Sequence, residues 1–410
     1  MSVIQARTDR WLLPDGVDEL LPEAAWRVER LRRDIVDRCR AWGFELVMPP
    51  LVEYLDSLLT GSGAGEVMNR QTFKLVDQQN GRTLGVRADM TPQVARIDAH
   101  ALRSDAPNRL CYTGSVLKAR ADGAGGSRSP QHFGAELFGH AGVESDVEIV
   151  RLMLETVSLG GLPPGALLLD LGHVGVYRTL AADAALGADD EARVFEALRR
   201  GSVPDLAERL AEAGATSAAG ERLATLCTLR GDASLIGRAR DALAGAGPGV
   251  GRALDEIERV VEAVLATHPD TPILVDLAEL RGFRYHTGVL FAVHDRGGAT
   301  LANGGRYDRV GEAFGRARAA TGFSGDLKQL ADRSRAAPGA DAAGPGGPDA
   351  PPLAVHVADP AADGAWREIE RLRARGERVL CALPGSPDER FRCDRELVRD
   401  GDGWALRPLR

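Results

Sequence analysis

The 410-residue sequence lacks the features that mark several protein classes. It has five cysteines, an odd number, with no Cys-x-x-Cys pair, so we expect reduced thiols and neither a disulfide framework nor a zinc site. No run approaches the ~20 apolar residues of a membrane helix. Charged residues and Pro14 also interrupt the N-terminus before a signal peptide would develop its apolar stretch. These absences predict a cytoplasmic protein without membrane association.

A basic surface is also missing from the composition. The formal net charge is −8, whereas a protein that grips a polyanion usually has an excess of Lys and Arg. The charge argues against nucleic acid as a partner. The histidines outside the motifs described below are scattered and form no ligand pattern, so no metal is expected.

The apolar fraction of 44% is ordinary for a globular chain, and the length predicts two or three domains. Helical spacing over 22–42 and strand-like segments that follow it define a first region, 1–175. Residues 176–268 are rich in Ala, Leu, Glu and Arg and predict a helical insertion, after which strands resume over 269–333. Residues 334–352 have the Pro/Gly composition of a flexible linker, and 353–410 predict a short β-α-β fragment.

Two blocks of the first region carry chemistry. The helix of 22–42 is followed by Gly-Phe-Glu-Leu-Val-Met-Pro-Pro, a helix–strand–proline pattern that is common by itself. The second block, Val86–Pro92, places Asp89 two residues before Thr91 at the end of a strand. A carboxylate with a hydroxyl suits an ammonium group. On spacing alone, a capping Asp-x-Thr at the strand end is the more frequent interpretation.

A third block joins two strands through a loop. Leu110–Arg120 ends in Lys118 and Arg120, and the returning strand, Gln-His-Phe-Gly-Ala-Glu, contains His132 and Glu136. Without its surroundings, Glu136 would be interpreted as a buried, hydrogen-bonded strand carboxylate.

The fourth block has the most specific pattern. Leu280–Phe291 contains Arg281 followed by Tyr285 and His286, and Asn-Gly-Gly-Arg-Tyr-Asp follows about twenty residues later, at 303–308. A Gly-Gly-Arg-Tyr-Asp turn alone is a modest clue, but its pairing with Arg-Gly-x-x-Tyr is distinctive.

In this order, the blocks resemble class II aminoacyl-tRNA synthetases, and histidyl-tRNA synthetases in particular, over about residues 10–330. The resemblance implies an α+β fold with an antiparallel sheet flanked by helices, plus the helical insertion. Motif 1, with Pro50, implies a homodimeric core. The resemblance also assigns a histidine-binding pocket to a set of positions, three of which differ from the family: Asp89 for Glu, His132 for Gln and His286 for Tyr. The candidate histidine-binding residues are Asp89, Thr91, His132, Glu136, Arg281, Tyr285 and His286.

The ATP half of the resemblance is degenerate. Lys118 stands where a synthetase has the Arg that forks onto the α-phosphate, and Lys cannot make that planar bidentate contact. Arg120 reverses the charge of the family's Glu, and Gln329 replaces the Arg that holds the γ-phosphate. Each lost charge-assisted contact costs ~1.5–3 kcal/mol of binding. We therefore expect no adenylation, no catalytic residues and no cofactor.

The variant Tyr-His-Thr-Gly at 285–288 and the stretch ending at Phe323 resemble the family of ATP phosphoribosyltransferase regulatory subunits. The resemblance implies a non-catalytic subunit required for the first step of histidine biosynthesis and for its feedback regulation by histidine. It also implies a hetero-octamer with the short-form catalytic subunit. These subunits lack the anticodon-binding domain of the synthetases, so 353–410 is expected to be a departure from the family. The alternative is a histidyl-tRNA synthetase, or another synthetase-like paralogue that activates an amino acid.

Overall fold

The computed structural model of the chain comprises two compact units, one within Val28–Ala337 and one within Pro338–Arg410. From residue 336 onward, the expected linker lies outside the described residues. The structure describes residues 12–60, 65–121, 126–215, 218–280, 282–283, 285–335, 354–383, 390, 393–401 and 403–409.

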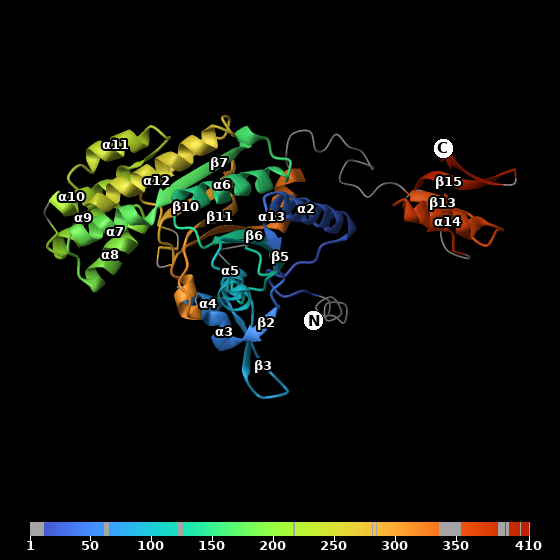
Figure 1. Cartoon of the computed structure of the whole chain (residues 1–410), viewed down its shortest axis with the longest axis horizontal. Helices are drawn as coiled ribbons and strands as arrows, with labels where there is room; N and C mark the ends of the chain where they lie inside the picture. The colour runs from blue at the N-terminus through green and yellow to red at the C-terminus, as the bar shows by residue number, and fades with distance from the viewer. Residues whose placement is uncertain are drawn as a thin grey trace, which may run out of the picture. The chain divides into compact units, whose positions relative to one another are not determined.

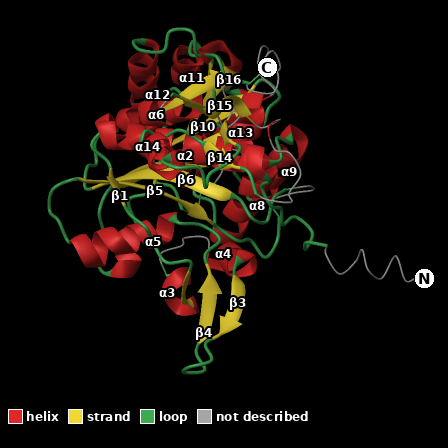
Figure 2. Cartoon of the chain, turned by 90° about the vertical axis from the view of Figure 1, so that its right-hand side faces the viewer, coloured by secondary structure: helices red, strands yellow, loops and turns green. Residues whose placement is uncertain are grey.

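The larger unit is built on a mixed sheet of nine strands (Figures 1 and 2). Two neighbouring pairs, β1–β5 and β7–β9, are parallel, and the other pairs are antiparallel. The predicted α+β fold with an antiparallel core sheet is therefore confirmed. In their spatial order the strands are β1 (Glu45–Leu46), β5 (Asn108–Ser115), β6 (Gln131–Phe138), β12 (Ala320–Asp326), β11 (Thr300–Arg306), β10 (Val289–Asp295), β7 (Leu167–His173), β9 (Ile273–Asp276) and β8 (Arg230–Gly231).

Helix α6 (Val143–Ser158) packs against β6 and β10–β12 on one face of this sheet. Arg306 at the end of β11 reaches Asp146 of α6, whereas the neighbouring Gly305 pairs with Gly322, which pairs with Glu136. Because side chains alternate along a strand, Glu136 projects from the face opposite α6.

The predicted first helix is observed as α2 (Pro22–Ala41). Its buried residues Val28, Leu31, Ile35 and Cys39 recur at helical spacing. At its end, the indole N–H of Trp42 donates to Glu155 of α6 at 3.1 Å, which ties the two helices together.

A second, three-stranded sheet precedes the core strands, and the sequence analysis foresaw only its middle strand. Its order is β2 (Val52–Tyr54), β4 (Thr83–Val86) and β3 (Phe73–Val76), with helices α3 (Leu55–Leu59) and α4 (Gly65–Gln71) beside it. The Arg82 guanidinium lies 3.4 Å from the centre of the Tyr54 ring. A helix follows this sheet and leads towards the site: α5 (Thr91–Arg96) continues as a π-helical segment, η2 (Ile97–Leu102).

The region expected to be a helical insertion consists of six α-helices with one short strand, β8, which joins the main sheet. The helices bury Val, Leu and Ile residues at helical spacing. They are α7 (Val174–Asp183), α8 (Ala188–Arg199), α9 (Val203–Glu212), α10 (Ala218–Thr225), α11 (Leu235–Ala242) and α12 (Pro248–Leu265). Helix α12 packs against α6, β7 and β10, and α7 packs against β10.

After the insertion, the short helix η5 (Val310–Phe314) connects β11 to β12, and α13 (Leu327–Arg335) closes the larger unit. No helix in the described part of the chain is long and apolar enough to cross a membrane.

The smaller unit is larger than the β-α-β fragment that the sequence predicts. Its four-stranded sheet has the order β14-β13-β15-β16, and α14 packs against it around Val355, Ile369, Leu372 and Leu397. The last two strands form an antiparallel hairpin that the sequence analysis missed, because charged residues interrupt their apolar pattern. The elements are β13 (Ala354–Val357), α14 (Ala365–Ala374), β14 (Val379–Cys381), β15 (Cys393–Asp400) and β16 (Gly403–Pro408).

Candidate functional site

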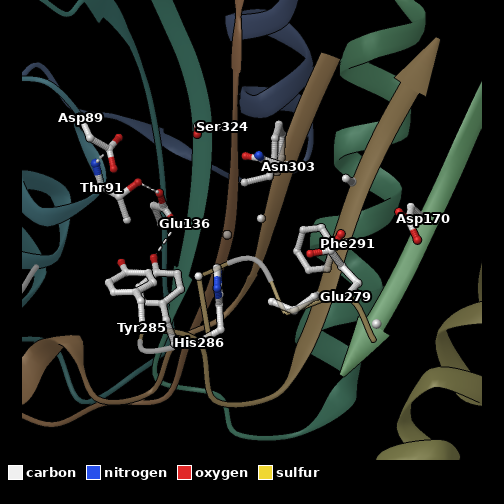
Figure 3. Close-up of a pocket in the computed structure, with 18 of the residues that line it drawn as sticks. Asp89, Thr91, Glu136, Asp170, Glu279, Tyr285, His286, Phe291, Asn303 and Ser324 are labelled. Carbon is white, nitrogen blue, oxygen red and sulfur yellow. Dashed lines mark hydrogen bonds between the residues drawn. The ribbon is translucent and has the colours of Figure 1, made fainter. Parts of the chain in front are cut away.

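The centre of the site is the carboxyl group of Glu136 on β6, which is 1% exposed. Its Oε1 accepts hydrogen bonds from the hydroxyls of Thr91 and Tyr112, both at 3.0 Å, and its Oε2 accepts one from Tyr307. Figure 3 shows Thr91 pointing toward Glu136. The neighbouring strand provides room for this carboxyl group, because a Cβ at Gly322 would lie 1.6 Å from Oε2. Glycine at 322 is therefore required by the site.

Burial controls the charge of this group. It raises the pKa of Glu136 to about 8, although the hydroxyls of Tyr307, Thr91 and Tyr112 oppose the shift. Burial and the nearby Glu136 also raise the pKa values of Tyr112 and Tyr307 well above 10. The phenols therefore stay protonated and serve as donors, and a cation brought beside Glu136 would favour its ionised form.

An aromatic wall stands next to Glu136. The ring of Tyr285 stacks on Tyr307 with centroids 5.1 Å apart and an interplanar angle of 19°, and His286 meets Tyr285 edge-on at 5.3 Å. The hydroxyl of Tyr285 is buried and has no hydrogen-bond partner among the described residues. Since a buried hydroxyl without a partner is costly, this oxygen marks a place for a ligand atom.

These groups line a cavity of about 610 Å³. Five of the predicted residues meet in it, and its other end is lined from β7, β10, β11 and β12 (Figure 3). The described lining residues include four carboxylates and neither Lys nor Arg, so the cavity suits a ligand with a cationic group. The predicted residues are Asp89, Thr91, Glu136, Tyr285 and His286, and those at the other end include Asp170, Glu279, Phe291, Asn303 and Ser324.

Asp89 and Thr91 lie at the start of α5 and both line the cavity. Asp89 Oδ1 accepts from the backbone N–H of Met90 at 2.7 Å and of Thr91 at 3.4 Å. The Thr91 hydroxyl meanwhile donates to Glu136. These hydrogen bonds hold Thr91 in place at the cavity.

A second cavity, of about 890 Å³, contains the positions that the resemblance assigns to ATP. Lys118 and Gln329 line it together with His132, whose Nδ1 lies 3.8 Å from Asp89 Oδ1. The structure therefore places His132 in this cavity and not in the lining of the first. Arg120 is exposed and is absent from the described lining.

Carboxylates neutralise cations of this second cavity. The Lys328 ammonium lies 3.0 Å from Asp18 Oδ2, and Arg333 Nε lies 3.1 Å from Asp295 Oδ2. Asp326 adds a further carboxyl group, whose pKa burial raises. A phosphate chain in this cavity would therefore meet carboxyl groups, as well as cations that are already paired with carboxylates.

Comparison with known proteins places this geometry in a family. Residues 16–330 match the family described as histidyl-tRNA synthetase, and residues 352–407 match the ATP phosphoribosyltransferase subunit HisZ C-terminal domain. A protein named ATP phosphoribosyltransferase regulatory subunit from Thioalkalivibrio sulfidiphilus is 52% identical, with 98% of this chain and 99% of the relative covered. The chain belongs to the ATP phosphoribosyltransferase regulatory subunit family.

Other members and solved structures agree. A regulatory subunit from Chromohalobacter salexigens is 49% identical over 98% of this chain and 99% of its own length. A solved structure described as an ATP phosphoribosyltransferase regulatory subunit/histidyl-tRNA synthetase from Bacillus halodurans C is 26% identical, covers 92% of this chain and 94% of its own, and has a TM-score of 0.77. Histidyl-tRNA synthetase from Nostoc sp. PCC 7120 shares the fold, with a TM-score of 0.74 at 17% identity and coverage of 95% and 91%.

The match over 352–407 corrects one expectation. The C-terminal segment was expected to depart from the regulatory subunit family, but it matches a C-terminal domain that belongs to that family. The charged hairpin of β15 and β16 gave no apolar signal by which the domain could be recognised from the sequence.

The regulatory subunit motifs at 285–288 and 303–308 are joined by hydrogen bonds. Thr287 Oγ1 donates to Asp308 Oδ2 at 2.8 Å, and the Thr287 N–H donates to the carbonyl of Arg306 at 2.7 Å. The buried Arg306 side chain donates to Asp146, Ser145 and the carbonyl of Gly142. The arginine of Gly-Gly-Arg-Tyr-Asp therefore fastens β11 to α6, whereas the next residue, Tyr307, serves the cavity.

Some site residues escaped the sequence analysis, and one predicted residue lies outside the structure described. Tyr112 and Tyr307 were not predicted. Tyr307 stood within a recognised motif, and Tyr112 follows from strand pairing, because it lies opposite Gly134, two residues from Glu136 on β6. Arg281 lies outside the described residues. The described residues contain no group of three or more His, Cys, Asp and Glu side chains that could hold a metal ion.

Proposed function

We propose that this chain is a non-catalytic regulatory subunit that binds histidine in the cavity around Glu136. It transmits the presence of bound histidine to the short-form catalytic subunit of ATP phosphoribosyltransferase. The two subunits form a hetero-octamer that carries out the first step of histidine biosynthesis. The observation that carries the proposal is the buried Glu136 carboxyl group with its three hydroxyl donors, next to a buried tyrosine hydroxyl without a partner.

The chemistry of histidine fits this cavity at two places. Its neutral imidazole has one donor nitrogen and one acceptor nitrogen. The donor suits an acceptor oxygen of the Glu136 carboxyl group, and the acceptor suits the open Tyr285 hydroxyl. The α-ammonium group suits Asp89, whose carboxylate also lines the cavity.

The second cavity supports the absence of adenylation. Bending and neutralising the triphosphate of ATP requires cations aimed at its phosphates. Lys118 is a point charge, Gln329 has no charge, and Lys328 is already paired with Asp18. A phosphate chain would have to displace that ion pair and approach the half-buried Asp326. These features favour a regulatory subunit over the alternative, a working synthetase.

A homodimeric core is also part of the proposal. Strand β1 is at the end of the nine-stranded order, and apolar residues beside it are exposed: Leu46 by 39%, Leu51 by 48% and Met48 by 78%. Exposed apolar residues on an edge strand favour burial against another chain.

Regulation requires histidine to bind the active and inhibited states of the complex with different affinities. The test reconstitutes the chain with the short-form catalytic subunit and titrates histidine against transferase activity. We expect activity only when both subunits are present, and a loss of activity as histidine rises.

A second arm measures histidine-dependent ATP–pyrophosphate exchange by the chain alone. Exchange well above background would overturn the non-catalytic assignment and favour a synthetase. Activation without any effect of histidine would keep the regulatory role but overturn histidine as the effector at this site.

A further inference from the structure

Two side chains of the cavity, Tyr285 and His286, are supplied by the connection between β9 and β10. This segment turns sharply: the N–H groups of Tyr285 and His286 both donate to the carbonyl of Gly282, at 2.7 and 2.9 Å. Gly282 has φ +63°, and a Cβ there would lie 2.6 Å from His286 Nδ1. The turn is thus compact, but its position relative to the sheet depends on what holds it from outside.

One side of the turn is fixed to the core by the hydrogen bonds of Thr287 to Asp308 and Arg306. The other side is held by the helical insertion. Nη2 of Arg178, on α7, donates to the carbonyl of Phe283 at 3.0 Å and to that of His286 at 2.8 Å. A single guanidinium group thus bridges both ends of the segment that presents Tyr285 and His286 to the cavity.

Phe283 completes this attachment. Its ring centroid lies 5.0 Å from that of Tyr177 on α7, at 89°, and 5.0 Å from that of Phe195 on α8, at 38°. Arg178 also lies 5.0 Å from the centre of the same ring. Aromatic and cation–π contacts of this kind each add on the order of 1 kcal/mol beyond burial. A side chain of the ligand turn is therefore inserted between two helices of the insertion.

We propose that Arg178 is a positioning residue for the ligand cavity, through which the helical insertion sets and senses the position of Tyr285 and His286. This inference rests on the proposed function and deepens it, since it names the part of the fold that responds to occupancy. The turn connects the cavity directly to the helical insertion. Its side chains at 285 and 286 line the cavity, and its carbonyls and Phe283 contact α7 and α8.

The test uses the full chain and the variant Arg178→Met, which keeps much of the apolar stem but removes both donors. Arg193→Met is the matched control, because Arg193 lies on α8 and pairs with Asp190 on an exposed surface. Hydrogen–deuterium exchange without ligand should show the amides of Tyr285 and His286 exchanging about tenfold faster in Arg178→Met, with the control like wild type. Histidine affinity, by calorimetry, should fall about tenfold in Arg178→Met only.

The effect of histidine binding on the helices of the insertion distinguishes a positioning role of Arg178 from a merely structural one. Histidine should slow amide exchange in α7 and α8 of the wild type and of Arg193→Met, and this protection should be lost in Arg178→Met. Phe283→Leu, which weakens the ring contacts but leaves the guanidinium in place, should show a partial loss of protection. It serves as the second variant if Arg178→Met does not fold.

Equal exchange at Tyr285 and His286 in wild type and Arg178→Met would overturn the inference. So would a faster-exchanging turn with unchanged histidine affinity. If the wild type binds no histidine at all, the proposed function fails. In that case, exchange in the ligand-free proteins still decides whether Arg178 holds the turn.

Discussion

The two cavities of the larger unit differ in how their charged and polar groups are used. Around Glu136, three hydroxyls converge on one carboxyl group, and the hydroxyl of Tyr285 is open to a ligand. Around Lys118 and Gln329, the Lys328 ammonium is paired with Asp18, and Asp326 adds a half-buried carboxyl group. The first arrangement is prepared for a small cationic or amphoteric molecule, and the second is poorly prepared for a phosphate chain.

This difference indicates how a synthetase-like fold can serve regulation. In the proposed function, recognition of histidine depends on Glu136, which strand β6 holds in register, and on Thr91 and Tyr285 beside it. Binding of ATP depends on guanidinium groups at loop and helix ends, where Lys and Gln fit without disturbing the sheet. The chemistry can thus be lost while the pocket is retained.

The largest expected effect is at the centre of the first cavity. Glu136→Ala should lower histidine affinity by roughly a hundredfold, about 3 kcal/mol, because the ligand loses its hydrogen-bond acceptor. Calorimetric titration measures this loss. Glu148→Ala is the matched control, because Glu148 pairs with Arg109 away from this cavity. Similar losses in both variants would mean that the ligand binds elsewhere.

The second effect is a pH dependence of stability. Because the pKa of Glu136 is raised from 4.5 to about 8, the folded state holds a proton that the unfolded state has released between these pH values. This contribution is complete below pH 4.5 and is lost as the pH rises through 8. The free energy of unfolding should therefore fall by about 2 to 3 kcal/mol across this window, less than the full shift implies because the folded state can relax around the ionised carboxylate.

Denaturant titrations at pH 5 and pH 8.5 measure this change, with Glu136→Gln as the comparison because its amide does not titrate. The difference in stability between wild type and Glu136→Gln should decrease as the pH rises. A constant difference would show that Glu136 is ionised throughout and that its hydroxyl donors outweigh the cost of burial.

A smaller effect tests the open hydroxyl directly. Tyr285→Phe should leave thermal stability unchanged or slightly raised, since the hydroxyl has no partner among the described residues. The same change should weaken histidine binding by about tenfold, the value of one hydrogen bond to a ligand. Tyr307→Phe is the contrast, because it removes a donor to Glu136 and should also lower stability. Unchanged affinity in Tyr285→Phe would exclude its hydroxyl from the binding site.

The sequence predicts the regular parts of this fold well and its polar interactions less well. The long amphipathic helix α2 has strong periodicity, so its position was found within a few residues. The β15–β16 hairpin was missed because Asp, Arg and Glu alternate with few apolar residues. The small sheet was only partly found, since its strands have three or four residues and mixed burial.

At the site, residues within recognised motifs were found, but their partners were not always foreseen. Resemblance indicated Glu136, yet only strand pairing brings Tyr112 beside it. Arg306 stood in the most specific motif, and its six hydrogen bonds show that it is structural. His132 lines the second cavity. From its position on β6, the ring approaches Asp89 on the side of that cavity, with Nδ1 3.8 Å from Asp89 Oδ1. Such partners are set by tertiary packing, which a local pattern does not contain.

The smallest effect is expected from attempts to restore the second cavity. Combining Lys118→Arg and Gln329→Arg returns two guanidinium groups, and adding Asp18→Asn releases Lys328 from its ion pair. We expect ATP affinity, measured by calorimetry with Mg²⁺, to rise by only about fivefold, because each partly exposed charge contributes little and Asp326 still opposes the phosphates. Asp15→Asn in place of Asp18→Asn controls for charge in the same segment. If the triple variant gained histidine-dependent pyrophosphate exchange, the side chains at positions 18, 118 and 329 alone would account for the absence of catalysis. The arrangement of the rest of the second cavity would then be adequate for binding ATP.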